Sequence, residues 1–182
     1  MFFDGGCRGN RPGGAGAAVV RIAGDAGPYQ VVWAGSMSYA AGTTTNNIAE
    51  NLGLLTGLTA CGKLGNSPVH VVGGSEMIIR QHRSRHPPKA AHLKPIYWTR
   101  RRLIAKVQVA SWHHHLREFN KMADWLANQA MDSKRSSQVC LKQESSTAGL
   151  WRHLKELAGG DVGHWILEYG IANPAGEANV GL

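Results

Sequence analysis

The sequence predicts an α/β fold in which helices flank a mixed β-sheet. Short β-rich runs separated by glycine turns open the chain, and apolar strands then alternate with helical patterns up to about residue 132. Strands joined by tight turns pair antiparallel, whereas strands joined through helices pair in parallel. We therefore expect three antiparallel strands followed by two parallel strands.

Each element has its own signal. Phe2 and Phe3 begin the first strand, and "AAVVRI" and "YQVVWAGSMSY" are β-rich runs on either side of a turn at 24–27. Thr45 is a good N-cap for a helix that carries leucines at helical spacing and ends near Gly62. The later segments are a strand over 69–72, a short helix capped by Ser75 and broken by Pro87 and Pro88, a basic helix over 92–105, a strand over 106–112, a loop over 113–119 and a helix over 120–131.

The composition changes at Ser133, where serine, glutamine, threonine and glycine become frequent. We therefore divide the chain into a folded domain, 1–132, and a C-terminal extension, 133–182, which lies outside the core fold and is partly disordered or forms one helix. An amphipathic helix could lie between Thr147 and Ala158, and "HWILEY" could be a strand or a docking segment.

The charge is concentrated in the first part of the chain. Residues 1–132 hold fifteen of the 20 basic and seven of the 12 acidic side chains, so they carry the whole formal charge of +8. From Arg80 to Lys106 no acid interrupts the basic residues, and Tyr97 and Trp98 lie among them. This pattern favours nucleic-acid binding. The alternative is a solvated helical face without a partner.

Cysteine usage and hydropathy limit the class of protein. The three cysteines are odd in number and lack C-x-x-C spacing, so they indicate neither a disulfide framework nor a zinc site. No apolar run approaches the roughly 18 residues that span a bilayer, and the N-terminus has no signal-peptide pattern. We expect an intracellular protein, in the cytoplasm or nucleus, that is not secreted and has no membrane partner.

Three local patterns are weak. Gly57 to Lys63 has the spacing of a phosphate loop, but Leu64 replaces the required Ser or Thr and the glycines fall at a helix end. The run 113–115 of three histidines could bind a metal, although adjacent side chains point different ways. "GGS" at 73–75 could bind phosphate at a helix N-terminus, but a tight turn also needs glycine.

Three carboxylates are more informative. Asp4 ends the first apolar strand, Glu50 lies in the first turns of the best helix, and Asp124 lies at the start of the last helix of the domain. Helix N-terminal stabilisation explains Glu50 and Asp124 but neither Asp4 nor the joint placement. Acids gathered within a basic surface suit a Mg²⁺ site that acts on phosphodiesters.

Five ordered blocks resemble one known family, type 1 ribonuclease H, in its bacterial, archaeal and retroelement-derived version. The resemblance covers about residues 1–132. The blocks are "FDGGCRGN" at 3–10, "TTNNIAE" at 44–50, "VHVVGGSEMIIRQ" at 69–81, "HLKP" at 92–95 and "HHLREFNKMADWLANQAMD" at 114–132.

The resemblance implies a ribonuclease H-like fold with a mixed five-stranded sheet. It also implies a hydrolase in which two Mg²⁺ ions, or Mn²⁺, held by an Asp-Glu-Asp-Asp set, cleave the RNA strand of an RNA–DNA hybrid. By position, Asp4, Glu50 and Asp124 would be metal ligands, and His114 would help product release. A monomer is expected. Residues expected at the nucleic acid are Cys7, Asn10, Asn47, Arg80, Lys94, Arg100 and Arg101, and Asn120 matches the loop-to-helix asparagine.

The sequence departs from the family pattern at two places. Gly74 stands where the third carboxylate is expected, and Glu76, within a helix turn, should point elsewhere. The first strand, central in this fold, starts at the beginning of the chain, so we expect an incomplete gene product or a destabilised fold. The first hypothesis is a hybrid-binding ribonuclease H with one or two metals and impaired or absent cleavage. The alternatives are a non-catalytic nucleic-acid-binding module and a mobile-element remnant.

Overall fold

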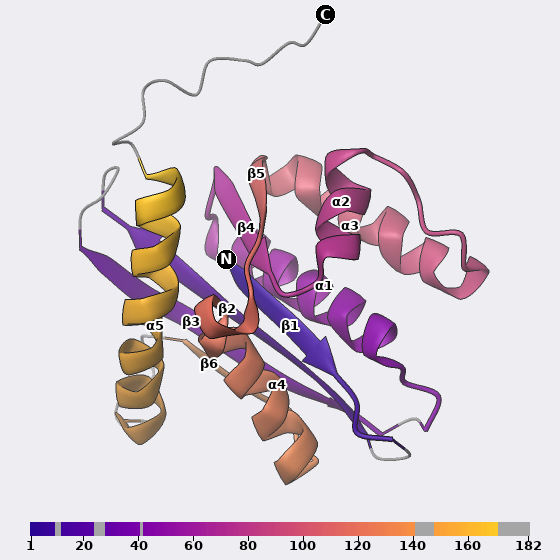
Figure 1. Cartoon of the computed structure of the whole chain (residues 1–182), viewed down its shortest axis with the longest axis horizontal. Helices are drawn as coiled ribbons and strands as arrows, with labels where there is room; N and C mark the ends of the chain where they lie inside the picture. The colour runs from indigo at the N-terminus through magenta and orange to yellow at the C-terminus, as the bar shows by residue number, and fades with distance from the viewer. Residues whose placement is uncertain (10–11, 24–27, 41, 141–147, 171–182) are drawn as a thin grey trace, which may run out of the picture.

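The computed structural model describes residues 1–9, 12–23, 28–40, 42–140 and 148–170. Within them the chain forms one six-stranded sheet, in the order β5-β4-β1-β2-β3-β6, with helices on both faces (Figure 1). The strands are β1 (Phe2–Gly6), β2 (Gly13–Ile22), β3 (Tyr29–Tyr39), β4 (Val69–Gly73), β5 (Val109–His114) and β6 (Ser137–Cys140). The helices are α1 (Asn46–Leu64), α2 (Glu76–Arg83), α3 (Lys94–Val107), α4 (Lys121–Ser133) and α5 (Ala148–Tyr169).

The strand pairing confirms the predicted mixed sheet. β2 pairs antiparallel with both β1 and β3, whereas β4 pairs in parallel with β1 and with β5. β6 is a sixth strand that the sequence did not predict, and it pairs antiparallel with β3 between Trp33↔Cys140 and Ser36↔Ser137. Its four residues are too few to show a strand period, so only pairing with β3 identifies it.

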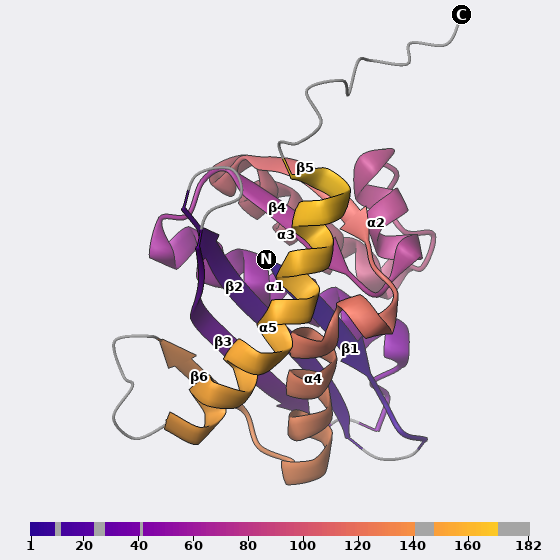
Figure 2. The same cartoon turned by 60° about the vertical axis from the view of Figure 1, so that its left-hand side comes forward.

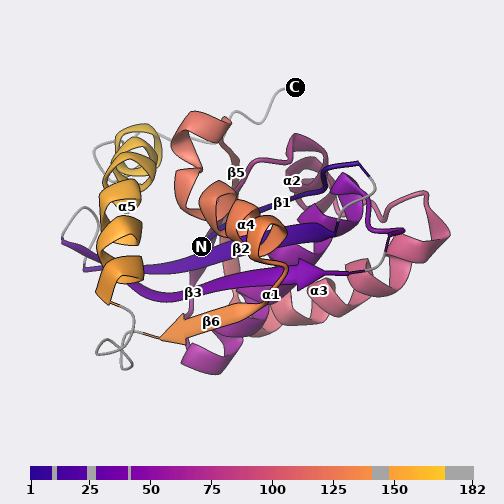
Figure 3. The same cartoon turned by 90° about the horizontal axis from the view of Figure 1, so that it is seen from below.

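The two faces of the sheet bury different halves of β1. Phe3 joins a core cluster with Leu54 and Leu58 of α1, and Phe2 joins a second cluster with Met122 of α4 and Trp151 of α5. This division follows from the alternation of side chains along a strand. Figure 3 shows α1 and α3 on one side of the sheet and α4 and α5 on the other.

Two glycines let helices approach the strand backbone closely. A Cβ on Gly5 would lie 2.2 Å from the carbonyl carbon of Ala49 in α1, and a Cβ on Gly16 would lie 2.2 Å from the carbonyl oxygen of Ala123 in α4. Neither position has room for a side chain. The close contacts bring the residues after Ala49 and Ala123, Glu50 and Asp124, towards the end of β1.

Several element boundaries differ from the predicted ones. α1 continues to Leu64 and ends at Gly65 in the left-handed conformation, so the segment from Gly57 to Lys63 is helical and is not a phosphate loop. α3 ends only at Val107, because Gln108 adopts the left-handed conformation. β5 therefore starts later than expected and includes His113 and His114, which the sequence assigned to a loop.

The described part of the extension packs on the sheet. α5 is one continuous helix, so "HWILEY" is helical rather than a strand. Figure 2 shows α5 lying beside α4 on the same face. The expected domain boundary at residue 132 stays a prediction. None of the helices within the described residues is long and apolar enough to cross a membrane.

Candidate active site

Asp4 lies in the middle of β1 and lines a cavity of about 550 Å³. One of its carboxylate oxygens accepts a hydrogen bond of 2.8 Å from the backbone N–H of Gly5. Burial raises the pKa of Asp4 to about 6, and the charges of Asp124 and Glu50 act in the same direction, against the Gly5 hydrogen bond and the charge of Arg117. Glu50 and Asp124 therefore lie close enough to Asp4 to influence its ionisation.

Glu50 lies in the first two turns of α1 and faces the same cavity. Burial raises the pKa of this carboxyl, and a side-chain hydrogen bond from Ser75 opposes the rise. Ser75 occupies the N-cap position of α2 but makes no capping hydrogen bond with its side chain. The sequence predicted a helix cap; the structure shows the hydroxyl stabilising the charged form of Glu50 instead.

Asp124 lies in the first turn of α4, and both of its carboxylate oxygens have partners. Arg117 Nε lies 3.0 Å from one oxygen, and Asn128 Nδ2 donates to the other at 3.1 Å. The Arg117 side chain is 81% exposed, so this ion pair is weak and a cation could displace it. Asn128 holds the carboxylate from within α4.

Gly74 lies where a fourth side chain would enter the cluster. A Cβ built on it would lie 3.3 and 3.4 Å from the two carboxylate oxygens of Asp4 and 3.4 Å from Asn120 Nδ2. These separations are tight but permit a side chain. Glu76, two residues later, is exposed and does not line the cavity in the described structure. Gly74 therefore leaves a gap directed at Asp4.

The cavity brings together most of the predicted catalytic residues. His114, at the end of β5, and Cys7 line it with Asp4, Glu50 and Gly74. The two histidines on either side of His114 are buried. The ring of His113 lies 3.8 Å from that of Tyr169, and His115 Nδ1 lies 3.1 Å from the carbonyl oxygen of Phe119. The cavity is lined by His114 and His115 but not by His113, so the three histidines do not converge on one point.

The residues fit a divalent cation only in part. The donors are carboxylate oxygens, which Mg²⁺ and Mn²⁺ prefer. Among the described residues, however, no three or more His, Cys, Asp or Glu side chains form a group that could hold a metal ion. The four-carboxylate set implied by the resemblance is therefore incomplete, and Gly74 is the position at which it is open.

The residues predicted to contact nucleic acid differ in exposure and position. Arg80 and Lys94 are exposed on α2 and α3, and Arg101 is half-buried. Arg100 corrects the prediction, because it is fully buried, burial lowers its pKa to about 10, and none of its guanidinium nitrogens has a hydrogen-bond partner among the described residues. Asn47 does not line the cavity; its side chain accepts from Asn51 Nδ2 at 2.6 Å. Asn10 lies outside the described residues.

Four polar residues of the cavity were not predicted from the sequence: Arg8, Asn46, Arg117 and Asn128. Asn46 Oδ1 accepts from the Cys7 N–H at 2.7 Å, so this asparagine, rather than Asn47, borders the site. Arg8 bridges Asn128 and Asp132 at 2.5 Å each. The spacing of Asp124, Asn128 and Asp132 at four-residue intervals on one helix face was the available signal. For Arg117 the sequence held no such signal, because a short 3₁₀ helix between β5 and α4, Arg117–Phe119, sets the direction of its side chain.

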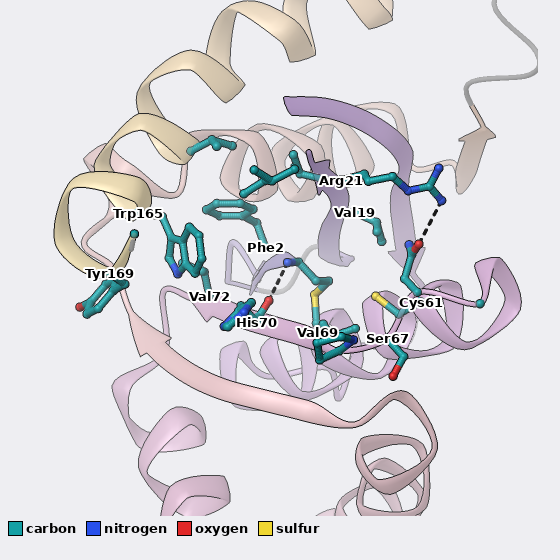
Figure 4. A pocket seen from close by; sticks show the side chains of 18 residues that line it. Phe2, Val19, Arg21, Cys61, Ser67, Val69, His70, Val72, Trp165 and Tyr169 are labelled. Atoms are coloured by element: carbon teal, nitrogen blue, oxygen red, sulfur yellow. Dashed lines mark hydrogen bonds between the residues drawn. The ribbon is translucent and has the colours of Figure 1, made fainter. Parts of the chain in front are cut away.

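A second cavity, of about 630 Å³, has different chemistry (Figure 4). It borders the N-terminal end of β1, where β2 runs on to Ile22 past the last partner of β1, Ala18. Trp165 and Tyr169 of α5 line one side, and no Asp or Glu is among the described lining residues. Without converging carboxylates among its described lining residues, it is not the catalytic candidate.

Comparisons with known proteins agree with this geometry. The family model described as "Reverse transcriptase-like" matches residues 2–130. The bifunctional protein Rv2228c of Mycobacterium tuberculosis is 36% identical over 134 residues, which are 74% of this chain and 35% of that protein. Ribonuclease HI of Halobacterium salinarum is 32% identical over 131 residues, 72% of this chain and 63% of that protein. The chain thus spans less than two thirds of these relatives.

Solved structures show the same fold. The N-terminal RNase H domain of Rv2228c superposes with a TM-score of 0.61 at 33% identity, covering 72% of this chain and 91% of that one. LC11-RNase H1, solved in complex with an RNA/DNA hybrid, gives a TM-score of 0.58 at 30% identity and covers 72% of this chain and 95% of that one. The matched region holds Asp4, Glu50, Gly74 and Asp124. The chain therefore belongs to the reverse transcriptase-like family of ribonuclease H proteins.

Proposed function

We propose that this protein is a monomer that binds RNA–DNA hybrids and cleaves the RNA strand slowly, in a reaction that depends on Mg²⁺ or Mn²⁺. The observation that carries the proposal is the approach of Glu50 and Asp124 to Asp4 in a basic protein: their charges act on Asp4, and Asp4 and Glu50 line one cavity. A neighbour of the same fold was solved with an RNA/DNA hybrid, which supports the same substrate here.

The basic residues of α2 and α3 supply the attraction for the nucleic acid. Arg80 and Lys94 are exposed, and Trp98, in the same helix as Lys94, is 53% exposed. Cationic side chains release counterions from phosphates, so the affinity falls with salt. The aromatic ring adds a surface for stacking on a base or packing against a sugar. Arg100, being buried, takes no part.

In the cavity, each side chain has a distinct task. When bound, a divalent cation would activate water and neutralise charge on the phosphodiester. Asp4 and Glu50 would hold it, and the Ser75 hydrogen bond favours the charged form of Glu50 that a cation needs, against the effect of burial. Asp124 becomes available when the exposed Arg117 moves away, and Arg117 is then free for a phosphate. Gly74 removes one oxygen ligand, which is the reason for slow cleavage.

The test uses the full chain and a labelled RNA–DNA hybrid. Cleavage is measured in Mg²⁺ and in Mn²⁺ for the wild type and for Asp4→Asn. We expect slow cleavage by the wild type that Asp4→Asn abolishes. Wild-type cleavage that survives Asp4→Asn would contradict this assignment of the site.

Binding is tested separately, by the dependence of affinity on salt. Arg80→Ala combined with Lys94→Ala should lower the slope by about one per lost phosphate contact. The matched control is Arg152→Ala, which removes an exposed charge from α5 on the other face of the sheet. Equal slopes for both variants, or no hybrid binding at low salt, would contradict the proposed surface.

A second candidate is a non-catalytic module that binds hybrid. The lack of a three-ligand group among the described residues favours it. The two candidates differ in one result: the module binds hybrid with the expected salt dependence but does not cleave it in either metal.

A further inference from the structure

Helix α4 has an unusual N-terminus. Its N-cap residue, Asn120, makes no capping hydrogen bond: Nδ2 donates to the carbonyl oxygen of Phe3 in β1 at 3.0 Å, and Oδ1 has no hydrogen-bond partner among the described residues. A helix begins with backbone N–H groups that have no partner within the helix, and a buried N–H without a partner is costly. The first amides of α4 therefore need an acceptor from another element.

Asp161 of α5 supplies that acceptor. Its two carboxylate oxygens accept from the backbone N–H groups of Lys121, at 2.9 Å, and Met122, at 2.8 Å. The Asp161 side chain is fully buried. A buried carboxylate that satisfies the first two amides also interacts favourably with the helix dipole. Residue 161 lies beyond the segment 2–130 that the family model matches.

The next turn of α5 contacts the loop before α4. The ring of His164 stacks on Phe119, with centroids 3.7 Å apart and planes 9° apart, and lies 4.8 Å from the ring of His115. Phe119 and His115 lie at the two ends of the loop that carries Arg117. Asp161 and His164 therefore hold both the start of α4 and the loop before it.

The N-terminus of α4 is directly connected to the carboxylate site. Asn120 ties it to Phe3, the residue before Asp4, and the Asp124 N–H donates to the Asn120 carbonyl oxygen at 3.1 Å. A shift of Lys121 and Met122 would therefore move Asn120 and Asp124 relative to Asp4.

We propose that Asp161 is a positioning residue, which fixes the first turn of α4 and thereby sets Asp124 and Asn120 against Asp4. The C-terminal helix α5 then contributes to the geometry of the carboxylate site. The geometric claim stands by itself, whereas its consequence for cleavage rests on the proposed function.

The test compares Asp161→Ala and Asp161→Asn with the wild type in the full chain, without metal. Amide hydrogen exchange is measured by NMR at Lys121 and Met122, together with the Asn120 side-chain amide signals. We expect Asp161→Ala to speed exchange at these two amides by roughly 10-fold or more and to shift the Asn120 signals. Asp161→Asn, which keeps one acceptor oxygen, should restore part of the protection.

Leu154→Ala is the control, because Leu154 is a fully buried residue of α5 without a hydrogen bond to α4. It should lower the melting temperature without selective exchange at Lys121 and Met122. Equal protection of these amides in Asp161→Ala and the wild type, or the same selective loss in Leu154→Ala, would overturn the proposal. If Asp161→Ala does not fold, Asp161→Asn decides by the same two readouts.

The consequence for cleavage is measured in a chain that also carries Gly74→Asp. There we expect Asp161→Asn to lower kcat and leave KM for the hybrid unchanged, because binding uses α2 and α3. If no variant cleaves hybrid, the proposed function fails while the exchange data still decide the role of Asp161. An unchanged kcat beside lost protection would limit Asp161 to stability and overturn its positioning role.

Discussion

Strand β1 has a cavity at each end, and the two cavities differ in chemistry more than in size. The cavity at the C-terminal end, about 550 Å³, contains Asp4 and Glu50, with Asp124 close by. The cavity at the N-terminal end, about 630 Å³, is bordered by Phe2, Val72 and Trp165 and has no acid among its described lining residues. The comparison shows that volume does not identify a catalytic site, whereas converging charge does.

The two ends also differ in what they contribute to stability. At the apolar end, aromatic side chains of α5 cover the sheet and gain free energy by leaving water. At the acidic end, burial of Asp4 beside two other carboxylates disfavours its charged form. The first end should respond to substitutions through stability, and the second through activity and pH.

The largest expected effect is at the acidic end. Gly74→Asp places a carboxylate beside Asp4, with a tight but permitted Cβ contact of 3.3 Å to an Asp4 oxygen. We expect hybrid cleavage to rise by about 100-fold to 1,000-fold, because a metal ligand is restored. The rate is measured in Mg²⁺ beside Gly74→Asn. An equal gain in both variants would argue against a missing carboxylate.

The next effect is at the apolar end. Trp165 is only 9% exposed and packs in the core cluster of α4 and α5. Trp165→Ala should lower the free energy of unfolding by about 3 kcal/mol, because it enlarges an existing cavity. Denaturant unfolding measures this. Hybrid affinity below the unfolding transition should not change, and a parallel loss of affinity would break the distinction between the two ends.

Asp4→Asn should stabilise the folded chain at neutral pH. The pKa of Asp4 is raised from 3.8 to about 6, so the folded chain retains this proton at pH values where the unfolded chain has lost it. Ionisation of Asp4 therefore lowers the free energy of unfolding as the pH rises from about 4 to 6. Asn removes this loss, and we expect a gain of about 2 to 3 kcal/mol at pH 7.

The measurement is denaturant unfolding in EDTA at pH 7 and at pH 4, where the gain should largely vanish. A gain of the same size at both pH values would instead indicate a packing effect.

The smallest expected effect concerns Ser75, whose hydroxyl stabilises charged Glu50. Ser75→Ala should raise the pKa of Glu50 further and destabilise the fold by about 1 kcal/mol at neutral pH. The loss should shrink at acidic pH, where Glu50 is protonated. NMR titration of the Glu50 carboxyl checks the direction, and Ser84→Ala on the exposed end of α2 is the control.

Much of the fold follows from local signals in the sequence. Apolar runs bounded by glycine and the cap at Thr45 predicted β1 to β5 and α1, and the structure confirms the mixed pairing. β6 was not predicted, because a segment of four residues has no recognisable strand pattern and is identified as a strand only by its pairing with β3. The position of α5 could not be predicted, because the apolar period of a helix shows which of its faces is buried but not which surface it packs against.

The candidate site divides in the same way. Asp4, Glu50, Asp124 and the gap at Gly74 could be named from the sequence, because scarce acids at element ends and ordered motifs are local features. Their environment could not be. Arg100 has the composition of a binding residue, yet the packing of α3 buries it completely. Ser75 stands at a typical N-cap position, yet its hydroxyl hydrogen-bonds to Glu50 instead of capping α2.

The sequence by itself determined which residues could take part in catalysis and in which order strands and helices follow along the chain, because caps, turns and apolar periods act over a few residues. The tertiary structure decided which side chains meet. Burial beside Asp124 and Glu50 sets the pKa of Asp4, and a carboxylate from α5, 37 residues after Asp124, holds the start of α4. Such contacts depend on distance in space, which no local pattern contains.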